Sequence, residues 1–146
     1  MPVEQQQQPV FLVTGSSRGI GLSLVRALVQ APGRQGAAVI ITSRDLARGE
    51  EVLQQLRAEL GEKEGARVEL LQLDITDKAS VDSLARRVRE EHGGLDVLVN
   101  NAGIAFSMDS KEPFGEQARR TVETNLHGTR RVTGPATARP FSLPPR

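Results

Sequence analysis

Four short apolar runs recur along the chain, and each is followed by a stretch with the spacing of an amphipathic helix. The runs cover Val10–Thr14, Ala37–Thr42, Arg67–Leu73 and Leu95–Val99. The first of these runs is continuously apolar, which predicts a strand buried on both faces; the second is expected to be a second buried strand, and the last two are expected to be strands. Strands that alternate with helices favour right-handed crossovers and a parallel sheet. The sequence therefore predicts an α/β protein whose parallel sheet is covered by helices.

The segments between the runs predict the helices. The first helix is expected to carry one apolar stripe, formed by Ile20, Leu24, Val25, Leu28 and Val29. The second helix is expected to begin at the N-cap Asp45 and to end at Gly61. It should turn four leucines inward, namely Leu46, Leu53, Leu56 and Leu60. Asp77 is expected to cap the third helix.

Composition argues against several classes of partner and site. The 146 residues carry 19 Lys and Arg against 18 Asp and Glu, so the net charge of +1 gives no reason to expect nucleic acid or an anionic membrane. Without cysteine, no disulfide and no thiolate metal site is expected, and no metal is assigned. No apolar run is long enough for a signal peptide or a membrane span, so a cytoplasmic location is expected. Residues 1–9, which include a run of glutamines, are expected to be a disordered arm.

Residues 14–21 read TGSSRGIG and lie between the first predicted strand and the first predicted helix. The three glycines, Gly15, Gly19 and Gly21, allow a sharp turn and a close approach of the backbone to a pyrophosphate. The N–H groups at the start of the following helix would then face the phosphate charge. The spacing differs from the more common G-x-G-x-x-G, and a plain tight turn is the alternative interpretation.

Three further polar stretches complete the pattern. Asp74 lies in LDIT, directly after the third predicted strand, and is either a ligand contact or a turn and cap residue. NNAG, residues 100–103, follows the fourth strand, at the edge where open α/β sheets bind ligands. Asn125 lies inside the last predicted helix, where asparagine is unfavourable. It either faces solvent or holds the local backbone and a water molecule.

Taken in this order, the four motifs resemble the landmarks of the short-chain dehydrogenase/reductase family. The segments GGLDVLVNNAGIAF (93–106) and TNLHGTR (124–130) are more similar still to the cytosolic NADPH-dependent carbonyl reductases. The resemblance covers about residues 10–132, which are expected to form an incomplete NADP(H)-binding domain. It implies a Rossmann-type, doubly wound parallel sheet, truncated after about four strands and five helices. It also implies NADP(H) as the cofactor and, in the full-length family, reduction of small ketones, aldehydes and quinones.

The resemblance also implies roles for individual residues. The glycines would frame the pyrophosphate, Asp74 would contact the adenine, and Asn100 and Ala102 would border the nicotinamide. Asn125 matches the asparagine of the family's Asn-Ser-Tyr-Lys tetrad, which holds a water molecule in the proton relay. The full set expected to contact the cofactor is Gly15, Ser17, Arg18, Gly19, Ile20, Gly21, Arg44, Asp74, Ile75, Asn100, Asn101, Ala102 and Gly103.

Two arginines favour NADP(H) over NAD(H). Arg18 in the glycine-rich loop and Arg44 after the second strand lie where a 2′-phosphate is expected, and a guanidinium offers forked, permanently charged donors. Asp45 lies near the position at which an acidic residue binds the ribose 2′-OH of NAD. Because Arg44 precedes it and no acid ends the strand itself, Asp45 is interpreted as a helix cap.

The catalytic serine, tyrosine and lysine of the family have no counterpart in this sequence. In the family, the tyrosine phenol protonates the substrate carbonyl, the lysine supports it and the serine orients the carbonyl. The chain contains no tyrosine; after Asn125 its only serine is Ser142, and no lysine follows Lys111. The chain is therefore expected to keep the cofactor-binding half of a reductase and to be inactive as given.

The carboxyl-terminal part of the sequence departs from the family. The last predicted helix runs from Gly115 to about Val132 and is expected to break at Gly134-Pro135, and residues 133–146 form a proline-rich tail. A splice variant, a frameshift or a truncated gene model would each give this pattern. Two alternatives to an enzyme remain: a non-catalytic module that binds NADP(H) or a partner, and an inert, poorly folded product. Without a fifth strand, the free edge of the fourth is expected to self-associate.

Overall fold

The computed structural model describes residues 8–33 and 36–136. Residues 1–7 of the predicted arm (1–9) and residues 137–146 of the predicted tail (133–146), including Ser142, lie outside the described residues. In the described part, the elements follow one another as β1 Val10–Val13, α1 Gly19–Gln30, β2 Ala38–Ser43, α2 Leu46–Gly65, β3 Val68–Gln72, α3 Lys78–His92, β4 Val97–Val99, α4 Phe114–Val122, η1 Glu123–Gly128 and α5 Thr129–Ala136. η1 is a π-helix.

The four strands form one parallel sheet in the order β3-β2-β1-β4. Leu12 of β1 lies in register with Ile40 of β2 on one side and with Leu98 of β4 on the other. The strand order reverses at β1, because β2 and β3 extend the sheet in one direction and β4 extends it in the other. The predicted α/β class with a doubly wound parallel sheet is therefore confirmed. Such a reversal is the place at which open α/β sheets bind ligands.

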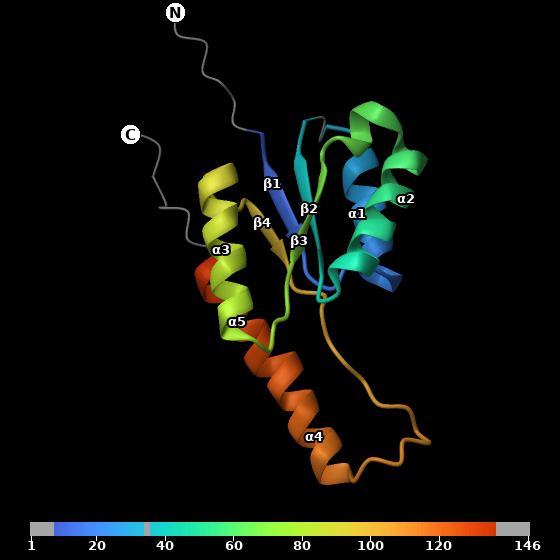
Figure 1. Ribbon diagram of the computed structural model, residues 1–146, viewed down its shortest axis with the longest axis vertical. Helices are drawn as coiled ribbons and strands as arrows, with labels where there is room; N and C mark the ends of the chain where they lie inside the picture. Colours follow the sequence, from blue (N-terminus) through green and yellow to red (C-terminus); the bar gives the residue numbers. More distant parts are fainter. Residues whose placement is uncertain (1–7, 34–35, 137–146) are drawn as a thin grey trace, which may run out of the picture.

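Helices cover both faces of the sheet, with α1 and α2 on one face and α3 and α5 on the other (Figure 1). Alternate residues of each strand point to opposite faces. In β1, Phe11 and Val13 join the core that includes residues of α1 and α2, whereas Leu12 joins the core that includes residues of α3. All three side chains are buried. Burial on both faces is the reason that this run shows no polar alternation.

Two residues of the predicted apolar stripes lie in solvent. Ile20 of α1 is 81% exposed and Leu46 of α2 is 46% exposed, so the prediction that they pack inward was wrong. Both lie in the first turn of a helix that starts beyond the carboxyl edge of the sheet, where the helix does not yet cover a strand. Later positions of the same stripes, among them Val25 and Leu56, are buried as expected.

The two predicted helix ends have different outcomes. Gly61 breaks α2 as predicted, with a non-helical φ of 80°, and a further helical segment continues to Gly65. The last helix continues from α4 through η1 and α5 to Ala136, so the predicted break at Gly134-Pro135 was wrong. The fixed φ of proline is itself helical, and in a last turn proline removes only one hydrogen bond from the helix.

α4 extends away from the sheet and its covering helices (Figure 1). None of its residues is buried, and its apolar side chains Phe114 and Val122 are 84% and 47% exposed. Within the described residues, no strand pairs with β4 on the side opposite β1. The fourth strand and the last helix therefore present apolar side chains that no described element covers.

Candidate functional site

Two left-handed glycines shape the loop between β1 and α1. Gly15 has a φ of 63° and Gly19 a φ of 56°, a region that L side chains rarely adopt. A methyl group on Gly15 would lie 2.8 Å from the Cα atom of Ala102, in the loop after β4. At Gly19, no heavy atom other than those of its chain neighbours and its own helix backbone lies within 4 Å of the same position. Gly15 is thus required for packing between the two loops, whereas Gly19 borders open space.

Thr14 joins the glycine-rich loop to the loop after β4. Its Oγ1 atom accepts hydrogen bonds from the N–H groups of Asn101, at 3.0 Å, and Ala102, at 2.9 Å. The Asn101 side chain completes the junction, since Nδ2 donates to the backbone oxygens of Thr14 at 3.0 Å and Gly15 at 3.1 Å. Thr14 is 1% exposed. In such a site an unpaired N–H group would be costly, so the hydroxyl fixes the two loops as one unit.

Ser16 and Thr42 join the same loop to β2. Ser16 Oγ donates to the backbone oxygen of Val13 at 2.7 Å and accepts from the Thr42 N–H at 2.9 Å. The Thr42 hydroxyl accepts from the Gly15 N–H at 3.1 Å. Ser16 and Thr42 are both buried. The glycine-rich loop is therefore held on two sides by hydroxyl groups, in addition to the backbone hydrogen bonds that Thr14 donates to Val99 and Ser16 donates to Thr42.

The two adjacent asparagines of NNAG have different surroundings. Asn101 contacts the glycine-rich loop, as described above. Asn100 is exposed, and its Nδ2 atom donates to Thr133 Oγ1 of α5 at 3.2 Å. Successive side chains of an extended segment point in opposite directions, which explains the difference. Asn100 therefore lies against the last helix.

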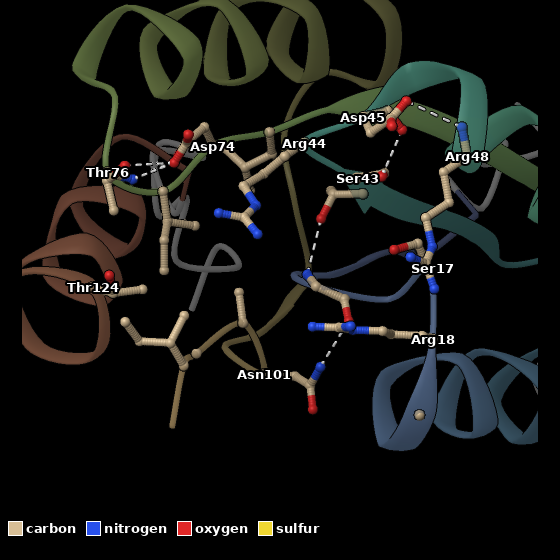
Figure 2. A pocket seen from close by; sticks show the side chains of 18 of the residues that line it. Ser17, Arg18, Ser43, Arg44, Asp45, Arg48, Asp74, Thr76, Asn101 and Thr124 are labelled. Carbon is tan, nitrogen blue, oxygen red and sulfur yellow. Dashed lines mark hydrogen bonds between the residues drawn. The ribbon is translucent and has the colours of Figure 1, made fainter. Parts of the chain in front are cut away.

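A cavity of about 540 Å³ opens at the carboxyl ends of the strands. Its side chains come from the glycine-rich loop, the end of β2, the first turn of α2 and the loops after β3 and β4 (Figure 2). The volume is typical of small-molecule sites. The lining residues are Gly15, Ser17, Arg18, Gly19, Ile20, Thr42, Ser43, Arg44, Asp45, Arg48, Leu73, Asp74, Ile75, Thr76, Asn101, Ala102, Gly103, Ile104 and Thr124.

All residues predicted to contact the cofactor line this cavity, except Gly21 and Asn100. Gly21 is buried beneath the loop, where a methyl group would lie 2.5 Å from Asn101 Nδ2 and 2.7 Å from the backbone oxygen of Gly15. The absence of a side chain at Gly21 thus lets the loop pack directly against the start of α1. Ile20 borders the cavity, which accounts for its exposure at the start of α1.

Other lining residues were not predicted, and they are Thr42, Ser43, Arg48, Leu73, Thr76, Ile104 and Thr124. Ser43 and Thr76 follow or end predicted strands, and the carboxyl edge of a sheet is a signal that would have included them. Asp45 was interpreted as a cap, and its Oδ1 atom does accept from the Arg48 N–H at 3.2 Å. Arg48 lies in the same first turn of α2, and only the orientation of the helix places it at the cavity.

α1 begins at this cavity without a capping side chain. Its N-cap residue, Arg18, makes no side-chain hydrogen bond to the first turn, and that turn holds no acidic residue. Asp45 and Asp77 cap α2 and α3, as predicted. The uncapped N–H groups and the positive end of the helix dipole favour an anion at this place. A phosphate group fits both features.

Asn125 lies in η1 and binds the backbone of Ile104 instead of lining the cavity. Its Oδ1 atom accepts from the Ile104 N–H at 2.8 Å, and its Nδ2 atom donates to the Ile104 oxygen at 2.9 Å. Asn125 is exposed and its side chain also holds backbone, so the structure combines parts of both alternatives; that backbone lies 21 residues earlier in the chain. The preceding residue, Thr124, does line the cavity. Single π-helical turns are frequent at functional sites.

The last helix also holds the loop after β3. Arg131 Nη1 donates to the backbone oxygen of Ile75 at 2.8 Å, and its Nη2 atom pairs with Glu123 at 3.0 Å. Gly128 approaches so closely that a methyl group there would lie 2.8 Å from Ile75 Cγ1. The wall of the cavity at Asp74 and Ile75 is thus fixed from behind by η1 and α5.

A second cluster of titratable side chains lies away from the cavity. Glu69, Glu91 and His92 bring ligand-type atoms within 4.8 Å of one another. His92 Nε2 lies 2.8 Å from Glu69 Oε2, and Arg87 Nε donates to Glu91 Oε1 at 2.9 Å. The hydrogen bond from Arg87 lowers the pKa of Glu91. Because a guanidinium already supplies the positive charge at these carboxylates, we assign no metal to this cluster.

A family model described as short chain dehydrogenase matches residues 9–139. The chain belongs to the short-chain dehydrogenase family. Carbonyl reductase [NADPH] 1 of Sus scrofa is 48% identical to it over 124 residues, an alignment that covers 84% of this chain and 40% of that protein. Carbonyl reductase [NADPH] 1 of Homo sapiens is 47% identical over 123 residues, with 84% and 42% covered. This short-chain dehydrogenase thus spans about two fifths of the length of the curated relatives that it matches.

Solved structures of short-chain dehydrogenases and reductases share the fold. Menthone neomenthol reductase from Mentha piperita superposes with a TM-score of 0.74 at 31% sequence identity, over 88% of this chain and 54% of that one. An actinorhodin polyketide ketoreductase crystallised with NADPH superposes with a TM-score of 0.72 at 33% identity, over 88% of this chain and 46% of that one. The fold of this short-chain dehydrogenase is therefore shared with proteins well beyond the carbonyl reductases.

Proposed function

We propose that this chain forms the NADP(H)-binding half of a carbonyl reductase. The observation that carries the proposal is the cavity at the carboxyl ends of the strands, in which the glycine-rich loop, Arg18 and Arg44 meet. The likeness to proteins named Carbonyl reductase [NADPH] supports the choice of cofactor. In the whole protein, the substrate class proposed is small ketones, aldehydes and quinones.

The lining residues fit a dinucleotide along its length. The uncapped start of α1 and the open space at Gly19 suit the pyrophosphate. Asp74 suits the adenine end, since its Oδ1 atom is used by the Thr76 N–H and hydroxyl while Oδ2 has no hydrogen bond within the described chain. Ala102 and Gly103 are small enough for close approach at the nicotinamide end. The cofactor supplies hydride when bound; these residues hold and orient it.

Arg18 and Arg44 would select NADP(H) over NAD(H). Both line the cavity, and both are exposed at its rim. A 2′-phosphate accepts charged, forked hydrogen bonds that a 2′-hydroxyl cannot match. One carboxylate oxygen of Asp45 caps α2, because it accepts a hydrogen bond from the Arg48 N–H.

We propose further that the chain as given binds the cofactor without reducing a carbonyl. It contains no tyrosine, and the family's serine and lysine positions have no match after Asn125. A non-catalytic module for NADP(H) or a partner is therefore the second candidate function, favoured by this lack. An inert, poorly folded product is the remaining alternative, and it predicts no saturable binding.

The same proposal includes a cytoplasmic location, which rests on the likeness to the cytosolic carbonyl reductases. Among the described helices, none combines the length and the apolar composition that a membrane crossing requires.

An equilibrium titration tests the proposal. NADPH and NADH fluorescence would be followed as purified protein is added, with Arg18→Ala and Arg44→Ala as variants. We expect saturable binding, tighter for NADPH, with the preference reduced in each variant by about 1.5–3 kcal/mol, as for a hydrogen bond to a charged group. Equal affinity for the two cofactors would contradict the assignment of the arginines. Absence of binding to either would contradict the proposed function itself.

A further inference from the structure

The wall of the cavity at residues 74–76 lies beyond the end of β3. The Leu73 N–H donates to the Ser43 oxygen at 3.0 Å and extends the pairing with β2 by one residue. Beyond it, the Asp74 N–H donates to Ser80 Oγ at 2.9 Å, and Asp74 Oδ1 accepts from the N–H and the hydroxyl of the residue two positions later. These hydrogen bonds join positions at most six apart. They shape the wall without fixing it against the elements across the cavity.

A long-range hydrogen bond reaches this wall from the last helix. Arg131 Nη1 donates to the Ile75 oxygen at 2.8 Å, across 56 positions of sequence, while Nη2 pairs with Glu123 Oε1 at 3.0 Å. The contact with Ile75 is partly buried, and a buried carbonyl that loses its donor is costly. The Arg131 side chain is 27% exposed and does not line the cavity. Any effect of Arg131 on a ligand in the cavity is therefore indirect.

The ion pair with Glu123 connects the same guanidinium to the π-helical turn. Glu123 is the first residue of η1, and the next residue, Thr124, lines the cavity on the same side as Asp74 (Figure 2). Asn125, one residue further along this turn, binds the backbone of Ile104 in the loop after β4. The guanidinium therefore ties the loop after β3 to a turn that also holds the loop after β4.

We propose that Arg131 is a positioning residue for the adenine end of the bound dinucleotide. This inference rests on the proposed function, in which Asp74 suits the adenine. Because its planar fork holds the Ile75 oxygen and Glu123 at once, the guanidinium sets the distance between the loop after β3 and η1. Gly128 allows this close approach, since a methyl group there would lie 3.1 Å from the same oxygen. Without the guanidinium the wall is held less firmly, and a bound adenine must order it at a cost in affinity.

Two substitutions of Arg131 and a matched control separate positioning from stability. Arg131→Met keeps an unbranched side chain that favours a helix and removes every donor. Arg131→Lys keeps the charge but lacks the planar fork. Arg57→Met is the control, because Arg57 Nη2 also donates to a backbone oxygen of β3, that of Val68 at 3.1 Å, at the end of the strand away from the cavity. Thermal melting checks that each variant folds, and Arg131→Met and Arg57→Met should lose similar stability.

The test measures the affinity of each folded variant for NADPH, NADH and the fragment 5′-AMP, at a temperature well below its melting point. We expect Arg131→Met to weaken all three by about three- to tenfold, as for residues that affect a site without touching its ligand. The preference for NADPH over NADH should not change, because all three ligands share the adenine. Arg131→Lys should recover part of the lost affinity, and Arg57→Met should bind all three ligands as the parent chain does.

The outcomes distinguish this inference from the proposed function. If the parent chain binds NADPH and Arg131→Met binds all three ligands equally well, or if Arg57→Met weakens them as much, the role of Arg131 is wrong and the proposed function stands. A loss confined to NADPH would also overturn that role, because the adenine would then not be what Arg131 positions. If Arg131→Met does not fold, Arg131→Lys decides, and affinities equal to those of the parent would contradict the inference. If the parent chain binds none of the three ligands, both proposals fail together.

Discussion

Asn125 and Ile104 exchange two hydrogen bonds, of 2.8 and 2.9 Å, across 21 residues of sequence. The side-chain amide of Asn125 donates to and accepts from the same backbone unit. It thereby fixes the loop after β4 against the π-helical turn of the last helix. A methyl group on the neighbouring Gly103 would lie 3.2 Å from Asn125 Oδ1, so the contact leaves little room. The position of the cavity wall at residues 103–104 depends on this pair.

We expect Asn125→Ala to lower the free energy of unfolding by about 1–2 kcal/mol, because two net hydrogen bonds are lost. Asn125→Asp should recover little of this lost free energy, since a carboxylate cannot donate a hydrogen bond to the Ile104 oxygen. Urea unfolding measures the stability of both variants. A shift of the unfolding midpoint reports the change in free energy when the slope of free energy against urea concentration stays constant. If Asn125→Ala unfolds at the same midpoint as the parent chain, the pair contributes nothing to holding the loop.

Thr14→Val should be more destabilising although the two side chains have nearly the same shape. The substitution leaves the partly buried N–H groups of Asn101 and Ala102 without their acceptor. We expect a loss of about 2–5 kcal/mol in the free energy of unfolding, from two unsatisfied donors. Thr121→Val is the control, because that hydroxyl only donates to the Gln117 oxygen within its own helix. Equal effects of the two substitutions would contradict the role given to Thr14.

Acid should weaken the contact between α1 and α2. Arg26 donates to Glu59 at 2.7 and 3.0 Å, and this hydrogen bonding holds the pKa of Glu59 below its usual value. The stabilisation is therefore present above the ordinary glutamate pKa and is lost as the pH falls through the lower pKa of the folded state. We expect Glu59→Gln to be slightly less stable than the parent chain at neutral pH, with the difference vanishing in acid and shrinking in high salt.

Urea midpoints of both chains across this pH range measure the effect of Glu59. Glu50→Gln, on the exposed side of the same helix, is the matched control and should show no such difference. A Glu59→Gln difference that stays constant into acid would show that the ion pair is not its cause.

The free edge of β4 should mediate self-association. Val97 is 38% exposed, and within the described chain no strand covers this edge. Unpaired strand edges pair readily with other chains, and a lysine at the edge discourages this. We expect size-exclusion chromatography to show oligomers or aggregates of the parent chain and a shift of Val97→Lys toward monomer. If Phe114→Ser dissociates the oligomer and Val97→Lys does not, the contact lies on α4 and the edge-strand explanation is wrong.

Much of the fold could be predicted because its signals are local. The first strand is a continuous apolar run and the other three are rich in apolar residues, and the glycine-rich loop has its motif directly between a strand and a helix. The errors fall where tertiary structure overrides periodicity. Ile20 continues a helical stripe in the sequence, but it lies at the cavity. Gly134-Pro135 is a breaking signal, yet α5 continues through it to Ala136.

Site residues that belong to a sequence motif could be predicted. Site residues that reach the cavity only through packing between elements could not. Asn100 and Asn101 are indistinguishable in the sequence, and the alternation of an extended chain directs only Asn101 to the glycine-rich loop. The Thr42 hydroxyl accepts a hydrogen bond from the Gly15 N–H, although the two residues are 27 positions apart in the sequence. Arg48 reaches the cavity only because α2 starts at its rim. Each of these depends on a relation between elements that no local pattern records.

NADPH oxidation by the purified chain, with a quinone or an aromatic aldehyde as acceptor, tests most directly whether this chain is a cofactor-binding half without its catalytic acid. NADPH binding would be established first in the same sample. We predict binding with no oxidation above a buffer blank, because loss of a positioned acid alone costs about 10²–10⁴-fold in rate. Protein-dependent oxidation well above the blank, and abolished in Arg44→Ala, would contradict the account.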